Sequence, residues 1–155
     1  MEALVKRTTL IVRSVENSLK LYQDVIGMST YYDNEILVSG KGLPAGEPNS
    51  MTRLVILKAK DPVVGMIGLL EFTDPAIPDP GPYPKRLTIG GTVFVMSTDD
   101  VQAVYAGAQE VPGVHIHGAP FDEEVTGADG STIKMTSLSF FDPDGYFIEV
   151  NQRHN

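Results

Sequence analysis

Two stretches of this chain repeat one another, and the repeat is the feature that most restricts the fold. The run TTLIVRSVENSLKLY at residues 8–22 has a counterpart, TVFVMSTDDVQAVY, at 92–105, and KDPVVGMIGLL at 60–70 has a counterpart, FDPDGYFIEV, at 141–150. Each copy reads as a strand and a helix, followed at a distance by a turn and a final strand. One such module would leave a face of its sheet uncovered, so the repeat predicts two modules packed around a shared cavity.

The first module is predicted to contain a strand, a helix and three further strands. The predicted strands cover Leu4–Val12, a segment beginning at Thr30, Thr52–Lys58 and Met66–Phe72. Ser14 is predicted to cap the helix and Gly27 to end it. The apolar positions of this helix recur at helical spacing at Val15, Leu19, Tyr22 and Ile26. The Gly- and Pro-rich stretch 36–49 is predicted to be a loop that could cover a cavity, and Asp61-Pro62 is predicted to be a turn.

A proline-rich segment separates the two modules, with prolines at positions 75, 78, 80, 82 and 84. It is predicted to be a stiff, extended linker. The expected organisation is a first module at 1–73, a linker at 74–91 and a second module at 92–155, which together form one compact domain. The second module is predicted to have a helix capped by Asp99 or Asp100, with its apolar face at Val101, Val104, Tyr105 and Ala108. Its predicted strands cover Thr92–Thr98, Val114–His117, Thr132–Phe141 and Tyr146–Gln152.

The second module ends in a predicted hairpin at Phe140–Val150. Asp142-Pro143-Asp144-Gly145 has the residues of a type I turn in order, and aromatic and β-branched residues flank it. Because strand side chains alternate, Phe147, Glu149 and Asn151 should share one face of the returning strand. Glu149 then has two interpretations: an exposed glutamate on an edge strand, or a carboxylate that projects into a cavity.

The hairpin sequence DPDGYFIEV resembles the C-terminal signature of the vicinal oxygen chelate superfamily, which contains glyoxalases, bleomycin-resistance proteins and extradiol dioxygenases. The segment Thr9–Met28 resembles the opening strand and helix of the same superfamily, so the likeness covers nearly the whole chain. The resemblance implies an α+β fold in which two βαβββ modules curl into an open, barrel-like cleft.

The resemblance also implies where a divalent metal would bind, because metal-using members take ligands from the first and last strands of each module. The matching positions are Arg7 (or its neighbour Thr8), Gly68, Val93 and Glu149. Only Glu149 can be a ligand, whereas catalytic sites need about three protein ligands. Glu71 is expected on the opposite strand face from Gly68. We therefore expect no metal and no cofactor, with a divalent metal as the less favoured alternative.

The histidines and a nearby acidic triplet offer a second, weaker metal hypothesis. His115 and His117 share a strand face by their spacing, but the more common reading is an exposed edge strand with polar side chains. The acidic run Asp122-Glu123-Glu124 is expected to lie in a solvated loop. His154 is expected to fray with the C-terminal tail.

Composition narrows the partners and the compartment. Twelve basic and twenty acidic residues give a net charge of −8, which disfavours nucleic acid. The absence of cysteine excludes disulfides and thiolate chemistry. No long apolar run and no secretory signal pattern are visible, so we expect no membrane partner and a cytoplasmic protein.

Two functional classes remain open from the sequence. The first is a metal-free protein that binds a small organic molecule in the cleft. The residues expected to contact this ligand are Arg7, Thr9, Gly68, Val93, Val95 and Glu149. The alternative is a lyase or isomerase of the glyoxalase type, with or without a divalent metal, in which Glu149 is a general base and Arg7 stabilises an oxyanion.

Two further expectations concern assembly and the pairing of charged groups. A homodimer is expected, because resembling proteins commonly pair modules across a two-fold axis. One hypothesis is that Arg7 and Glu149 point into one cavity and form an ion pair that an anionic ligand could open. The alternative is that Arg7 turns outward to solvent and Glu149 is protonated or hydrated.

Overall fold

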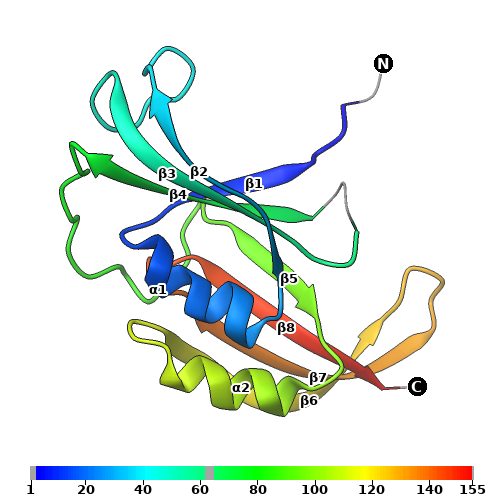
Figure 1. The fold of residues 1–155 in the computed structure, drawn as a ribbon. Helices are drawn as coiled ribbons and strands as arrows, with labels where there is room; N and C mark the ends of the chain where they lie inside the picture. Colours follow the sequence, from blue (N-terminus) through cyan, green and yellow to red (C-terminus); the bar gives the residue numbers. More distant parts are fainter. Residues whose placement is uncertain (1–2, 62–64, 155) are drawn as a thin grey trace. The chain divides into compact units, whose positions relative to one another are not determined.

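The computed structural model describes residues 3–61 and 65–154, and the chain divides into two compact units, 1–81 and 82–155 (Figure 1). The first unit contains β1 (Arg7–Ile11), α1 (Val15–Leu19), a π-helical segment η1 (Lys20–Val25), β2 (Ser29–Val38), β3 (Ser50–Lys58) and β4 (Met66–Asp74). The second contains β5 (Val93–Ser97), α2 (Val101–Glu110), β6 (His115–Thr126), β7 (Thr132–Phe141) and β8 (Phe147–His154). Within the described ranges, no helix is long and apolar enough to cross a membrane.

Each unit has one mixed sheet of the same topology. The strand orders are β1-β4-β3-β2 and β5-β8-β7-β6. In each module the first and last strands along the chain, β1 with β4 and β5 with β8, are parallel neighbours, and the other neighbouring strands are antiparallel. The α+β fold class of two βαβββ modules is therefore confirmed. Pro62, the second residue of the predicted turn, lies outside the described residues.

The registers of the two parallel pairs establish which positions of the modules correspond. In the first sheet Arg7 is opposite Met66 and Thr9 is opposite Gly68. In the second sheet Val93 is opposite Phe147, and Val95 is opposite Glu149. Gly68 and Glu149 thus occupy equivalent positions, as do Arg7 and Val93.

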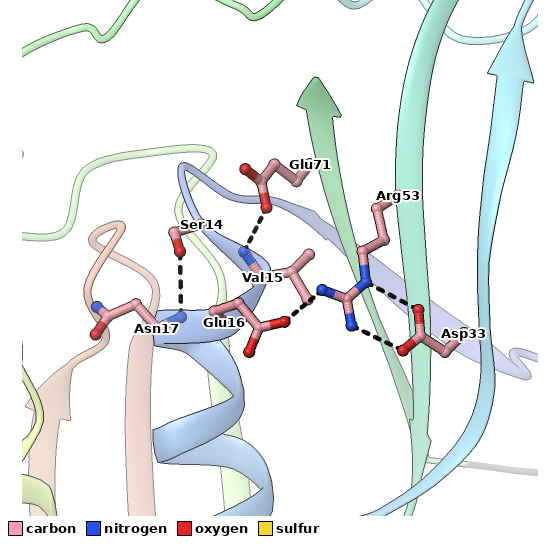
Figure 2. Close-up of polar contacts among 7 residues, drawn as sticks. All are labelled: Ser14, Val15, Glu16, Asn17, Asp33, Arg53 and Glu71. Atoms are coloured by element: carbon pink, nitrogen blue, oxygen red, sulfur yellow. Dashed lines mark hydrogen bonds and ion pairs between the residues drawn. The ribbon is translucent and has the colours of Figure 1, made fainter. Parts of the chain in front are cut away.

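The start of α1 is stabilised from the chain before it and from the sheet beneath it. Ser14 has an extended backbone, and its Oγ accepts a hydrogen bond of 3.2 Å from the Asn17 amide, as predicted for a cap. Glu71 of β4 accepts a 2.8 Å hydrogen bond from the Val15 amide (Figure 2). Both acceptors satisfy amides that the helix itself leaves without partners, and Glu71 thus lies on the helix side of the sheet, away from Gly68.

The buried face of this helical segment differs from the prediction. The helix changes to π geometry at Lys20, which alters the residue spacing from that point. Leu19 and Ile26 are only half-buried, while Ser18 and Leu21 are fully buried beside Val15 and Tyr22. The expected face was thus right for Val15 and Tyr22 and wrong for Leu19 and Ile26; at Ile26 the reason is that the prediction assumed one continuous α-helix.

An arginine on β3 forms ion pairs with both the helix and the neighbouring strand. Arg53 binds Asp33 of β2 in a bidentate pair, with bonds of 2.9 and 2.8 Å, and its third nitrogen contacts Glu16 of α1 (Figure 2). The hydrogen bond from Arg53 lowers the pKa of Asp33, and the bonds to Asp33 and Glu16 raise the pKa of Arg53. This ion-pair network links three elements of the first unit.

The other face of the first sheet is filled by the unit's own apolar side chains. A cluster of buried residues covers it: Leu54, Ile56, Met66, Leu70 and Phe72. Ala45, from the loop between β2 and β3, packs against this cluster. A Cβ at Gly46 would lie 2.5 Å from the Phe72 ring, so the loop backbone itself lies on the sheet. The loop spans 39–49 rather than 36–49, because β2 continues to Val38.

The predicted hairpin between β7 and β8 is confirmed in detail. The Gly145 amide donates to the Asp142 carbonyl at 3.1 Å, and Asp142 Oδ1 accepts from the amides of Asp144 and Tyr146 at 2.9 Å each. Gly145 has φ +96°, and a Cβ there would lie 2.7 Å from the Tyr83 ring. Glycine is thus required twice, for its backbone conformation and for the close approach of Tyr83.

Two neighbouring parts of the proline-rich segment make hydrogen bonds to different units. Arg13 binds Asp79 Oδ1 at 3.0 Å and the Gly81 carbonyl at 2.6 Å, within the first unit. Tyr83 donates a 2.6 Å hydrogen bond to the Gly113 carbonyl within the second unit. The predicted 74–91 linker thus contributes contacts to both units.

We expect Arg53→Met to lower the free energy of unfolding by about 1 kcal/mol, because it leaves two carboxylates without their partner. The folded pKa of Asp33 is depressed, so its stabilising contribution is present above its ordinary pKa and is lost as the pH falls through the folded value. The difference between wild type and variant should therefore shrink between about pH 5 and pH 2. Urea denaturation across this range measures it.

Lys134→Met is the control, since Lys134 is an exposed side chain that pairs with Glu124 at 3.3 Å. A loss equal to that of Arg53→Met, or a difference between wild type and Arg53→Met that does not change with pH, would contradict the role assigned to Arg53.

We expect Gly145→Ala to destabilise the protein more than Gly130→Ala. Gly130 has φ +82°, and a methyl group added there would have no atom within 4 Å, so its substitution costs only the backbone strain, about 1 kcal/mol. Gly145→Ala adds the clash with Tyr83. Equal urea midpoints for the two variants would show that the ring of Tyr83 moves away without cost.

Candidate functional site

A cavity of about 360 Å³ lies on one face of the second sheet. It is lined from three neighbouring strands: by Phe121, Glu123 and Val125 of β6, by Met135, Ser137, Leu138 and Ser139 of β7, and by Phe147, Glu149 and Asn151 of β8. The size is in the range of small-molecule sites. All its lining residues belong to the second unit, so the site is defined within that unit alone.

A row of hydrogen-bonded polar side chains crosses the cavity from β6 to β8. Ser137, which is only 1% exposed, contacts Glu123 on one side and Asn151 Oδ1, at 2.8 Å, on the other. Asn151 Nδ2 donates to Glu149 Oε1 at 3.2 Å. We name these four residues, Glu123, Ser137, Asn151 and Glu149, the polar row.

Strand alternation explains why the polar row and its apolar neighbours share a face. Phe147, Glu149 and Asn151 line the cavity together, as predicted, while Ile148 and Val150 are buried on the other face. Glu149 is half-buried on β8, which lies between β5 and β7. The interpretation of Glu149 as an exposed glutamate on an edge strand was therefore wrong.

Glu123, the middle residue of the acidic run on β6, is part of the site and was missed. The prediction ended this strand at His117 and gave 122–124 to a solvated loop, but β6 continues to Thr126. Glu123 reaches Ser137, and Asp122, on the other face, lies 2.5 Å from Thr136 Oγ1. The alternation of Phe121, Glu123 and Val125 was the available signal for a strand.

The predicted ligand-binding residues fall into two groups, one in each unit. Val95 is the neighbour of Glu149 across β5 and β8, and Val93 is the neighbour of Phe147. Both valines are exposed, at 65% and 44%, and extend the apolar surface beside the cavity.

The second group lies together in the first unit. A Cβ at Gly68 would lie 2.9 Å from Thr9 Oγ1 and 3.3 Å from Arg7 Cδ. Arg7 Nε donates to Thr9 Oγ1 at 3.0 Å, and both side chains are exposed. Arg7, Thr9 and Gly68 thus share a face, whereas the pairing of Arg7 with Glu149 joins the two units and stays a prediction.

The residues at the positions implied for a metal do not suit a divalent cation. The strand registers place an arginine, a glycine and a valine at the positions that correspond to ligands, and Glu149 alone has a carboxylate. Among residues 3–61 and 65–154, no group of three or more His, Asp or Glu side chains is arranged to hold a metal ion.

The histidines lie near aromatic rings and polar groups of the second unit. His115 stacks on Phe141 with a centroid distance of 6.3 Å, and His117 makes edge contacts with Phe141 and Phe147. Both are on β6, the edge strand, as expected. The expectation that His154 frays was wrong, because His154 is the last residue of β8 and its Nε2 lies 2.7 Å from Thr136 Oγ1.

The module topology and the ligand-sized cavity on one sheet define a protein of the two-module βαβββ class. Residues 4–150 match the family described as the Glyoxalase/Bleomycin resistance protein/Dioxygenase superfamily, and the chain belongs to this superfamily. No curated protein matched the sequence.

Solved structures of the same fold cover nearly the whole chain at low sequence identity. A glyoxalase family protein from Bacillus cereus is 17% identical with a TM-score of 0.71, covering 100% of this chain and 97% of its own. The protein TnmS3 from Streptomyces sp. CB03234, described as an antibiotic binding protein, is 21% identical with a TM-score of 0.53, covering 99% and 98%. At these identities the likeness shows the fold alone.

Proposed function

We propose that this protein binds a small organic molecule in the cavity of its second module, without a metal, and either sequesters the molecule or delivers it to a partner. The observation that carries the proposal is the polar row lying between apolar side chains on one sheet face. Apolar walls supply the affinity and a few fixed polar groups orient the ligand, which is the usual design of small-molecule sites. Such a function needs no set of metal ligands.

The comparisons support this class of function. The superfamily includes bleomycin resistance proteins, and one protein of the same fold is described as an antibiotic binding protein. On this proposal Val93, Val95 and Glu149 of the second module contact the ligand, and contact of Arg7, Thr9 and Gly68 with a ligand stays a prediction. A homodimer and a cytoplasmic location remain predictions of this proposal.

The second candidate is a lyase or isomerase that uses Glu149 as general base. Its support is that Glu149 is half-buried in a cavity and receives one hydrogen bond, from Asn151, at a length of 3.2 Å. A carboxylate acting as base must be able to reach a substrate proton. Turnover that disappears in Glu149→Gln, while ligand binding persists, would favour this candidate over pure binding.

We expect the neutral apolar dye 1-N-phenylnaphthylamine to bind the cavity, with an increase in fluorescence. Phe121 is 47% exposed and lines the cavity, so Phe121→Ser should weaken dye binding about three- to tenfold through lost apolar contact. A fluorescence titration measures both affinities.

Ile89→Ser is the matched control, because Ile89 is a fully exposed apolar residue of the same unit that does not line the cavity. It should leave dye binding within twofold of wild type. Dye binding that is lost equally in both variants, or absent in wild type, would count against the proposed site.

We expect the protein purified without chelators to contain well below one equivalent of divalent metal, because only one implied ligand position has a carboxylate. Elemental analysis by mass spectrometry after dialysis measures this. About one equivalent of zinc, nickel, manganese or iron would overturn the metal-free part of the proposal.

A further inference from the structure

The charged groups that line the cavity of the second module are both acidic. Glu123 and Glu149 stand at the two ends of the polar row, and the described residues that line the cavity include no Lys, Arg or His. Arg153 follows Asn151 on the same face of β8 by two residues, but it does not line the cavity and interacts electrostatically with Asp129. The cavity therefore combines two half-buried carboxylates with a lining that holds no compensating cation.

The polar row also has one hydrogen-bond donor too few. A serine hydroxyl can donate one hydrogen bond, yet Ser137 Oγ contacts two acceptors, a Glu123 oxygen and Asn151 Oδ1. If the Asn151 amide is rotated by 180°, its Nδ2 donates to Ser137 Oγ. The same rotation places Asn151 Oδ1 against Glu149 Oε1, and neither of these oxygens has a proton to donate. In either arrangement the Ser137 hydroxyl and the Asn151 amide supply protons for two of the three contacts.

The walls beside the polar row are apolar. Phe121, Val125, Met135 and Phe147 line the same cavity, and Phe121 and Val125 are 47% and 37% exposed. An aromatic ring or aliphatic body could bury these surfaces, and aromatic side chains also attract cations to their faces.

We propose that the ligand of this cavity is an apolar organic cation, an ammonium group attached to an aromatic or aliphatic body. The ammonium supplies the missing donor and the positive charge, and its body covers the apolar walls. This inference rests on the proposed function, because it names the ligand class of the same site. It differs from the anionic ligand that a pairing of Arg7 with Glu149 would favour.

Three probes of matched shape test the charge preference: 3-phenylpropylamine, which is a cation at pH 7, its neutral analogue 3-phenylpropanol, and the anion 3-phenylpropanoate. Titrations followed by amide chemical shifts of β6, β7 and β8 give each affinity and place the probe. We expect the amine to bind about tenfold more tightly than the alcohol, because its hydrogen bonds to carboxylates are charge-assisted. The propanoate should bind most weakly.

Substitutions of the two glutamates test whether the polar row causes the preference for the amine over the alcohol. Glu149→Gln and Glu123→Gln should each weaken amine binding about three- to tenfold more than they weaken alcohol binding. Glu124→Gln is the matched control: it removes the same charge from β6, but Glu124 is exposed and pairs with Lys134. It should change neither affinity more than twofold.

The outcomes separate this inference from the proposed function. Equal affinities for the three probes, or tighter binding of the propanoate, would overturn the cation preference and leave a ligand cavity in place. An effect of Glu124→Gln equal to that of Glu149→Gln would overturn the assignment to the polar row. If none of the three probes shifts the amides around the cavity, both the inference and the proposed function fail.

Discussion

The parallel pairing of the first and last strands of each module is the constraint on which the rest of the structure depends. Parallel neighbours cannot be joined by a tight turn, so the helix and two antiparallel strands must lie in the intervening chain. The pairing also places the last strand inside its sheet, between the first strand and the third. Glu149 is therefore fixed from both sides, with Val95 and Ser139 as its cross-strand neighbours. Glu149 is accordingly half-buried rather than exposed on an edge strand.

The same backbone produces two different sheet faces, and the difference lies in the side chains. In the first module the face that contains Gly68 is covered by a buried apolar cluster, onto which the loop at Ala45 packs. In the second module the equivalent face contains the polar row and a cavity. Buried polar groups need hydrogen-bond partners, and Ser137, although 1% exposed, obtains them from the neighbouring strands. The equivalent faces of the two modules thus differ: one is packed with apolar side chains and the other has a cavity.

The features predicted from the sequence were those specified by residues close together along the chain. The caps at Ser14 and Asp100 and the turn at Asp142 each depend on contacts spanning four residues or fewer, and each formed as expected. The full polar row could not be predicted, because Glu123 reaches Ser137 only through the pairing of β6 with β7. That pairing shifts register at two places, between Ile116 and Gly118 and between Gly118 and Phe121. No local pattern specifies such bulges. The polar residues at 122–124 were also interpreted as a loop, although they belong to β6.

The cavity is lined by side chains of three adjacent strands, β6, β7 and β8. Strand register holds its side chains in place before a ligand arrives, so little ordering is required on binding. The hydrogen bonds of the polar row restrict Glu149 further, because Asn151 holds one of its oxygens and Ser137 in turn holds Asn151. A general base must exchange its hydrogen bonds during a reaction, whereas a binding group benefits from keeping them. The fixed geometry of the row thus supports the proposed binding function, in which these groups stay in place.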